Sequence, residues 1–161
     1  MDFKEEHVEI EDIAHSLSNL CRHNGHINGF YSVSQHCMRV STKLAELGFN
    51  NKIQLCGLLH DASEAYLGDL AAPIKHYLHD YNKLEKIYQD VIFRRFDIES
   101  EWHKYHTEIK KVDKNIYYEE LEYFQTLRAE SRKNINNTPY NNKAKFILLY
   151  RHLQKGVRNG L

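Results

Sequence analysis

The dipeptide His60-Asp61 is the feature of this sequence whose residue types and position most directly suggest chemistry. It follows the apolar pair Leu58-Leu59, in a segment that should be largely buried. A buried charge beside a buried imidazole is costly unless the two are paired or bound to a metal ion. Glu64 follows His60 by four residues, so on one continuous helix all three side chains would share a face. An Asp–His hydrogen bond, or an exposed pair at a helix corner, is the alternative interpretation.

Further histidine and aspartate side chains lie on segments that could approach this dipeptide. His36 lies in the first turn of a predicted helix, and Asp113 lies on another helix that has one apolar face. Two histidines and two aspartates form a mixed nitrogen and oxygen donor set. Such a set of nitrogen and oxygen donors suits a divalent ion such as Mn²⁺, Co²⁺, Zn²⁺ or Fe²⁺ better than the sulfur donors of a cysteine-rich zinc site would. Spacing alone does not establish that the four residues converge.

The order of these residues resembles the signature of a known family. His36, His60-Asp61 and Asp113 are similar to the H…HD…D pattern of the HD-domain metal-dependent phosphohydrolases. The stretch 60–75, HDASEAYLGDLAAPIK, resembles the HDASE…GDL…PxK run of the small bacterial 5′-deoxynucleotidases. Three upstream segments are similar to the phage-type branch of this group, namely residues 12–22, 25–26 and 30–36. This branch includes the phage dATP triphosphohydrolases. The resemblance extends over about residues 10–116 and implies an HD-domain helical bundle.

The resemblance implies a role for each matching residue. The metal ligands, for Co²⁺, Zn²⁺, Mn²⁺ or Mg²⁺, would be His36, His60, Asp61 and Asp113. Glu64 matches an acid that transfers a proton beside the metal-bound water, and Asp69 matches a second acid near the sugar and the scissile phosphate. Arg22 and Lys75 match basic residues that hold phosphate or sugar oxygens, although each would otherwise be interpreted as an exposed cation. His26 is a further candidate for phosphate contact, or for capping its loop.

The implied reaction is hydrolysis of a phosphate ester of a deoxynucleoside. In the small deoxynucleotidases a tryptophan follows the arginine, whereas this chain has His23 there and its single tryptophan is Trp102. This difference favours the phage-type reaction, in which dATP gives deoxyadenosine and triphosphate. A 5′-deoxynucleotidase acting on monophosphates and a catalytically silent nucleotide-sensing HD module are the alternatives. A nuclease is a third alternative, and the balance of 22 basic and 22 acidic residues argues against it.

The elements that must position these residues are predicted to be helices throughout. The chain of 161 residues has two prolines and seven glycines, and it shows no clear strand alternation. Ser32 and Gln35 form a predicted capping box at the start of a helix that stops at Gly48. Further helices are expected at about 10–22, 51–66, 84–92, 100–129 (as one helix or two) and 144–153, with a short helix from Pro73 and a polar loop at 134–140. We predict an all-α HD-domain bundle of six to eight helices in a single domain, residues 1–161.

The composition excludes several classes of protein. With 42% hydrophobic and 27% charged residues and a net charge of zero, the chain is expected to be folded rather than disordered. Because it lacks an excess of basic residues, nucleic acid is not expected as a partner. Its longest apolar run is Phe146–Tyr150, too short to span a membrane, and its acidic N-terminus does not resemble a secretory signal. Three cysteines without CxxC spacing favour reduced thiols. We therefore expect a cytoplasmic enzyme, with the host cytoplasm as its location if it is phage-encoded. A homo-oligomer, dimer or hexamer, with a deoxynucleotide substrate is expected as well.

Overall fold

The fold is known from a computed structural model that describes residues 3–27, 29–127 and 138–159. Over these residues the chain forms eight α-helices and no sheet, which confirms the predicted all-α class and helix number. The helices are α1 (Ile10–Asn19), α2 (Val33–Glu46), α3 (Asn51–Leu58), α4 (Glu64–Leu67), α5 (Ala72–Lys75), α6 (His79–Arg95), α7 (Glu99–Leu127) and α8 (Pro139–Arg158). The single domain stays a prediction.

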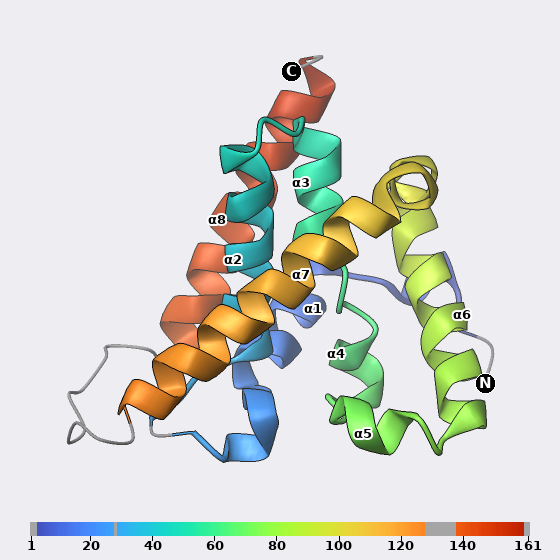
Figure 1. Cartoon of the computed structure of the whole chain (residues 1–161). Helices are drawn as coiled ribbons and strands as arrows, with labels where there is room; N and C mark the ends of the chain where they lie inside the picture. Colours follow the sequence, from blue (N-terminus) through green and yellow to red (C-terminus); the bar gives the residue numbers. More distant parts are fainter. Residues whose placement is uncertain (1–2, 28, 128–137, 160–161) are drawn as a thin grey trace.

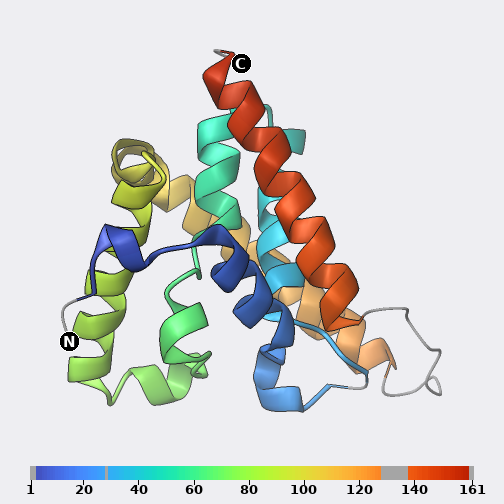
Figure 2. The same cartoon turned by 180° about the vertical axis from the view of Figure 1, so that it is seen from behind.

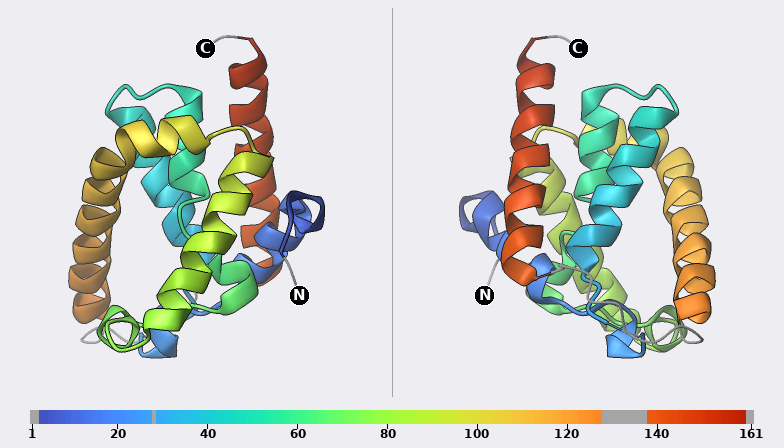
Figure 3. Two further views of the ribbon diagram at one scale, coloured as in Figure 1. Left: turned by 90° about the vertical axis from the view of Figure 1, so that its right-hand side faces the viewer. Right: turned by 90° about the vertical axis from the view of Figure 1, so that its left-hand side faces the viewer.

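The helices that carry the core pack in three layers. α2 and α3 lie against each other between α7 on one side and α8 on the other, as the side views show (Figure 3). α1 packs on α8, visible from behind in Figure 2, and α6 meets α7 near the bend that joins them (Figure 1). The core is made of fully buried apolar side chains from these helices, among them Leu17, Val40, Leu44, Leu55, Leu58, Ile109 and Phe146. This packing fixes α2, α3 and α7 relative to one another.

The start of α2 follows the predicted capping box. Ser32 Oγ accepts a hydrogen bond from the Gln35 backbone N–H at 3.3 Å, and Gln35 Oε1 accepts one from the Ser32 backbone N–H at 3.0 Å. Gln35 Oε1 also accepts a bond from Asn142 Nδ2 of α8 at 3.0 Å. α2 ends before Gly48, whose φ of 82° lies in the left-handed region that glycine adopts at low cost. The cap thus holds the first turn of α2 in place.

The predicted helix over 51–66 is wrong, because the helix breaks after Leu58. α3 ends there, and residues 59–63 form turns before α4 begins at Glu64. Gln89 of α6 satisfies the interrupted backbone: its Nε2 donates to Leu59 O at 2.7 Å, and its Oε1 accepts from Ser63 N at 3.0 Å. Such long-range bonds replace helical ones that would otherwise be lost at a buried break. The three side chains predicted to share one helix face therefore come from a turn and the helix that follows it.

Other boundaries also differ from the prediction. α1 ends at Asn19, and Arg22 begins a 3₁₀ turn, Arg22–Gly25, in place of the last turn of α1. The segment 100–129 contains one long helix, α7, and the helix predicted near 84–92 extends over His79–Arg95. The predicted loop at 134–140 lies largely outside the described residues, but Thr138 caps α8 and Pro139 begins it. In the described residues, no helix combines the length and apolar character needed to cross a membrane.

Candidate metal centre and active site

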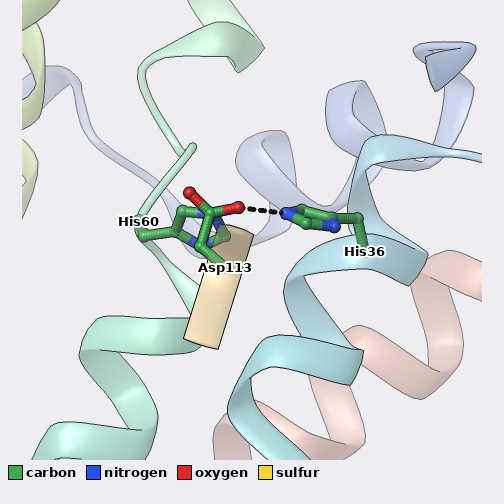
Figure 4. A group of neighbouring side chains, drawn as sticks. All are labelled: His36, His60 and Asp113. Carbon is green, nitrogen blue, oxygen red and sulfur yellow. Dashed lines mark hydrogen bonds and ion pairs between the residues drawn. The ribbon is translucent and has the colours of Figure 1, made fainter. Parts of the chain in front are cut away.

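The structure brings the four candidate ligands into one cluster. His36 projects from the first turn of α2, Asp113 projects from α7, and the His60-Asp61 pair lies in the turn after α3. His36 Nε2 lies 3.0 Å from Asp113 Oδ1 and 3.9 Å from Asp61 Oδ2. His60 Nε2 lies 3.2 Å from Asp61 Oδ2 and 3.6 Å from Asp113 Oδ1. In Figure 4 the Asp113 carboxylate is directed at the His36 ring, with His60 beside it.

Hydrogen bonds on the outer nitrogens orient both imidazole rings. His60 Nδ1 lies 2.8 Å from Gly57 O, a carbonyl that can only accept, so Nδ1 carries the proton and donates it. His36 Nδ1 lies 3.0 and 3.2 Å from the two carboxylate oxygens of Glu120, which sets the same tautomer. Each Nε2 therefore directs its lone pair toward the two aspartates. Metal-binding histidines are held in this way, by a carbonyl or carboxylate on the other nitrogen.

The donor atoms lie close to the spacing that one divalent ion requires. Ligand atoms about 2.0–2.2 Å from an ion lie about 3.0–3.5 Å from one another, and the four pairs above span 3.0–3.9 Å. Nε2 of His36 and His60 and a carboxylate oxygen of Asp113 form a compact donor group. His60 Nε2 is also buried without a hydrogen-bond partner among the described residues. The cluster thus fits a divalent cation.

Charge within the cluster shifts the pKa values of its members. Burial opposes protonation of His60, but the carboxylates of Asp61 and Asp113 raise its pKa well above 6.5. Burial would raise the pKa of both aspartates, yet the charge of His60 holds both values below the ordinary range, and at Asp113 the hydrogen bond to His36 adds to this effect. Without metal, the cluster therefore favours a proton on His60 between two ionised carboxylates. A cation that binds there takes the place of that proton.

A cavity of about 370 Å³ opens beside the cluster and collects most of the other predicted site residues. Its lining includes Arg22, Glu64, Asp69 and Lys75 together with Asp61 and Asp113. Lys110 and Tyr117 of α7 line it as well. The cavity therefore places acidic and basic side chains, an aromatic ring and two of the candidate metal ligands around one space of small-molecule size.

Glu64 is held at the edge of this cavity in an environment that favours its protonated form. Its side chain is buried, and its Oε1 accepts a hydrogen bond from Lys75 Nζ at 3.1 Å. Oε2 has no hydrogen-bond partner among the described residues. Burial and the charges of Asp61 and Asp69 raise the pKa of Glu64 well above 4.5, and Lys75 offsets this only in part. Burial also raises the pKa of Asp69, and the charge of Arg22 opposes that shift.

The two predicted basic residues are fixed by carboxylates. Arg22 donates from Nε to Glu120 Oε2 at 3.1 Å, and its Nη1 lies 3.9 Å from Asp61 Oδ2. Lys75 donates to Glu85 Oε1 at 2.6 Å in addition to Glu64. Burial opposes the charged form of each base, but the neighbouring carboxylates keep both pKa values above the ordinary range. Both side chains are therefore cationic where they line the cavity.

His26 is the one predicted site residue that the structure leaves away from this arrangement. It is exposed, and it is absent from the lining of the cavity. The preceding turn presents His23 and Asn24 instead, both with positive φ, and the His23 ring lies 5.7 Å from the ring of Tyr117. A role of His26 in substrate binding stays a prediction, as do the roles of the other site residues. Trp102 packs on Phe93, with ring centroids 4.7 Å apart, and lies outside this cavity.

Two residues that belong to the site were not found from the sequence. Lys110 Nζ lies 3.1 Å from Asp113 Oδ2 and 3.9 Å from Asp61 Oδ1, so it adds a cation at the cluster. Glu120 is fully buried behind His36. Both lie on α7 at positions three before and seven after Asp113. Because residues at these spacings share a face of a helix, the pattern could have identified them once Asp113 was chosen.

A second cavity also adjoins the cluster. It has a volume of about 380 Å³ and shares His60, Asp61, Lys75 and Lys110 with the site. The rest of its lining comes mostly from α6 and the start of α7, including Trp102, His103 and His106. The cluster thus borders two spaces, which together are much larger than one phosphate group.

The matches to known proteins are partial. No family model matches the chain. It is 41% identical over 92 residues to the uncharacterized protein YfdR of Escherichia coli strain K12, covering 56% of this chain and 48% of that protein. It is 43% identical over 72 residues to the uncharacterized protein RCAP_rcc00048 of Rhodobacter capsulatus, covering 42% of this chain and 37% of that protein.

A third relative has a name that describes an activity. The chain is 37% identical over 73 residues to a 5′-deoxynucleotidase of Erwinia tasmaniensis, covering 36% of this chain and 37% of that protein. In all three cases the matched part is less than half of the relative's length.

Proposed function

We propose that this chain is an HD-domain phosphohydrolase that uses a divalent metal ion to hydrolyse a phosphate ester of a deoxynucleotide. The observation that carries the proposal is the convergence of His36, His60, Asp61 and Asp113 from three parts of the chain, with each Nε2 turned toward the carboxylates. The partial likeness to a 5′-deoxynucleotidase supports the substrate class. The H…HD…D order of the sequence supports the family.

The metal ligands would be these four side chains, and the rest of the cavity would act on the substrate. When bound, a divalent ion supplies Lewis-acid polarisation of a phosphoryl oxygen and lowers the pKa of a water molecule. Arg22, Lys75 and Lys110 present three cations that bind phosphoryl oxygens and offset their charge in the transition state. Asp69 lines the same cavity, where it can accept a hydrogen bond from the sugar.

Glu64 is the group we assign to proton transfer. Its unpartnered Oε2 is available to a reacting oxygen, while Oε1 is held by Lys75. Burial and the charges of Asp61 and Asp69 raise its pKa, which favours a protonated carboxyl whose Oε2 can donate to the leaving oxygen. After donation the carboxylate is stabilised by Lys75 and can take a proton back from water. Asp69, whose pKa is also raised, is the second candidate for this role.

Within this class we propose dATP as the substrate and deoxyadenosine and triphosphate as the products. Support comes from the phage-type segments and from His23 in place of the tryptophan of the small deoxynucleotidases. A 5′-deoxynucleotidase acting on monophosphates is the second candidate, and the name of the Erwinia relative favours it. The homo-oligomer, dimer or hexamer, and the cytoplasmic location stay predictions.

The purified protein is incubated with dATP, dAMP, dGTP and ATP in the presence of Co²⁺ or Mn²⁺, and the products are identified by chromatography. This experiment tests both the metal-dependent hydrolysis and the proposed substrate. Release of triphosphate from dATP supports the proposed reaction, whereas release of orthophosphate from dAMP alone supports the deoxynucleotidase. Tight divalent-metal binding with no turnover of any of the four would instead support a silent nucleotide-sensing module. Wild-type activity in the metal-free protein would overturn the proposal as a whole.

A further inference from the structure

The buried carboxylate of Glu120 contacts four side chains that donate hydrogen bonds. It accepts hydrogen bonds from Tyr31 Oη at 2.6 Å, from His36 Nδ1 at 3.0 Å and from Arg22 Nε at 3.1 Å. Arg39 Nη1 reaches it at a longer 3.4 Å. The Glu120 side chain is completely inaccessible to solvent. Its neighbours therefore supply all the stabilisation that this charge requires.

The two oxygens of Glu120 accept hydrogen bonds from residues of two different parts of the site, the metal cluster and the substrate cavity. Oε1 accepts from Tyr31 and lies 3.0 Å from His36 Nδ1, and Oε2 accepts from Arg22 and lies 3.2 Å from the same His36 nitrogen. His36 belongs to the metal cluster, while Arg22 lines the cavity that would receive the substrate. One carboxylate thus holds a candidate metal ligand and a candidate phosphate-binding residue at once.

We propose that Glu120 is a positioning residue that sets both the His36 ring and the Arg22 guanidinium, and so supports metal binding and substrate binding together. This inference rests on the proposed function. By accepting from Nδ1 of His36, Glu120 leaves the lone pair of Nε2 facing Asp61 and Asp113. By accepting from Nε of Arg22, it fixes the guanidinium while Nη1 remains near Asp61, 3.9 Å away, at the cavity.

A carboxylate accepts from both donors without placing an N–H group against either of them. A glutamine in this place has the same shape but a single accepting oxygen, and its NH₂ group would face an N–H of either His36 or Arg22. Outer hydrogen bonds to a metal-binding histidine are worth about 10–100-fold in metal affinity. A hydrogen bond between charged groups, such as that of Arg22, corresponds to roughly 10–100-fold in binding. Glu120→Gln should therefore weaken both functions.

The test compares Glu120→Gln with Tyr31→Phe. Tyr31→Phe removes the shortest bond to Oε1 but leaves His36 and Arg22 with their acceptor, and Tyr31 does not line the substrate cavity. Co²⁺ affinity is measured by chelator competition without substrate, and KM and kcat are measured with dATP and dAMP. Glu120→Gln should lose at least tenfold in Co²⁺ affinity and show a KM at least tenfold higher at saturating Co²⁺. Tyr31→Phe should stay within about threefold of wild type in both.

A purely structural role for Glu120 predicts a different pattern, which would overturn the inference. In that case both variants lower the melting temperature, and the Co²⁺ affinity and KM of Glu120→Gln stay within threefold of wild type. Equal losses in the two variants would also overturn it. If Glu120→Gln does not fold, Glu120→Asp, which retains the charge but retracts the carboxylate, is judged by the same limits. A wild-type protein that binds no divalent ion and hydrolyses neither nucleotide would instead refute the proposed function.

Discussion

Replacing Glu64 with glutamine should abolish most of the turnover while leaving the metal cluster intact. The carboxyl group is 4% exposed, its Oε1 accepts from Lys75 Nζ at 3.1 Å, and its Oε2 has no hydrogen-bond partner among the described residues. The amide oxygen of glutamine can keep the bond to Lys75. Its NH₂ group can take the place of the protonated oxygen but cannot transfer a proton.

The magnitude follows from this geometry. Because burial and the charges of Asp61 and Asp69 raise the pKa of Glu64 well above 4.5, its environment favours the neutral form, whose charge and shape glutamine matches. We therefore expect metal content to be unchanged and the free energy of unfolding to change by less than about 1 kcal/mol. A positioned acid or base contributes about 10²–10⁴-fold, and we expect kcat to fall by that factor with little change in KM.

The assay measures kcat and bound metal on the same preparation of Glu64→Gln. Glu85→Gln is the matched control, since Glu85 is the other carboxylate on Lys75, at 2.6 Å, and among the described residues it forms no ion pair with the cluster. Its kcat should fall by less than tenfold. Nearly wild-type turnover of Glu64→Gln at full metal content would refute proton transfer by Glu64. Loss of metal together with activity would make Glu64 a ligand.

Three further predictions test the cluster and its support. His60→Ala and Asp61→Ala should each eliminate turnover and sharply reduce the bound metal measured by elemental analysis. His76→Ala, at an exposed position, is the control and should keep both turnover and metal. Full activity at unchanged metal content in His60→Ala or Asp61→Ala would contradict their assignment as metal ligands. Metal affinity should fall as the pH falls, because a proton competes with the metal for His60. Since the pKa of His60 is raised well above 6.5, the affinity should still be rising at pH values where an ordinary histidine is already neutral. Chelator competition between pH 5.5 and 8.5 measures this dependence, and an affinity that does not change with pH would argue for a site of carboxylates alone. Gly57→Ala should lower stability by about 1–3 kcal/mol in thermal unfolding, because the new Cβ would collide with Leu44 where α2 packs on α3; an unchanged melting temperature would mean that this contact is loose.

The parts of the fold that were predictable are those written in local sequence. Ser32 and Gln35 cap a helix through their own backbone and side-chain atoms, so the start of α2 follows from residues three apart. Gly48 ends the same helix through its own positive φ. The site residues His36, His60, Asp61 and Asp113 were selected by residue type and by their resemblance to a family pattern, and the structure places all four together.

The parts that were not predictable depend on contacts between distant residues. Nothing near residue 60 announces the break after Leu58, because the hydrogen bonds that stabilise it come from Gln89, 26 and 30 positions away. The role of Glu120 depends on Arg22 and His36, at separations of 98 and 84 residues. The sharp turn that presents His23 and leaves His26 exposed depends on two non-glycine residues with positive φ, which sequence patterns rarely predict.

The break after Leu58 is also what allows adjacent residues to act on one ion. Neighbouring side chains on an α-helix point about 100° apart, so a continuous helix would separate His60 and Asp61 more than the predicted shared face implies. In the turn that replaces the helix, His60 Nε2 and Asp61 Oδ2 lie 3.2 Å apart. The same turn leaves Gly57 O available to accept from His60 Nδ1. In a continuous helix that carbonyl would accept from the backbone N–H of Asp61, which here lies beyond the end of α3. Gln89, by satisfying Leu59 and Ser63, thus makes the geometry of the metal cluster compatible with a buried backbone.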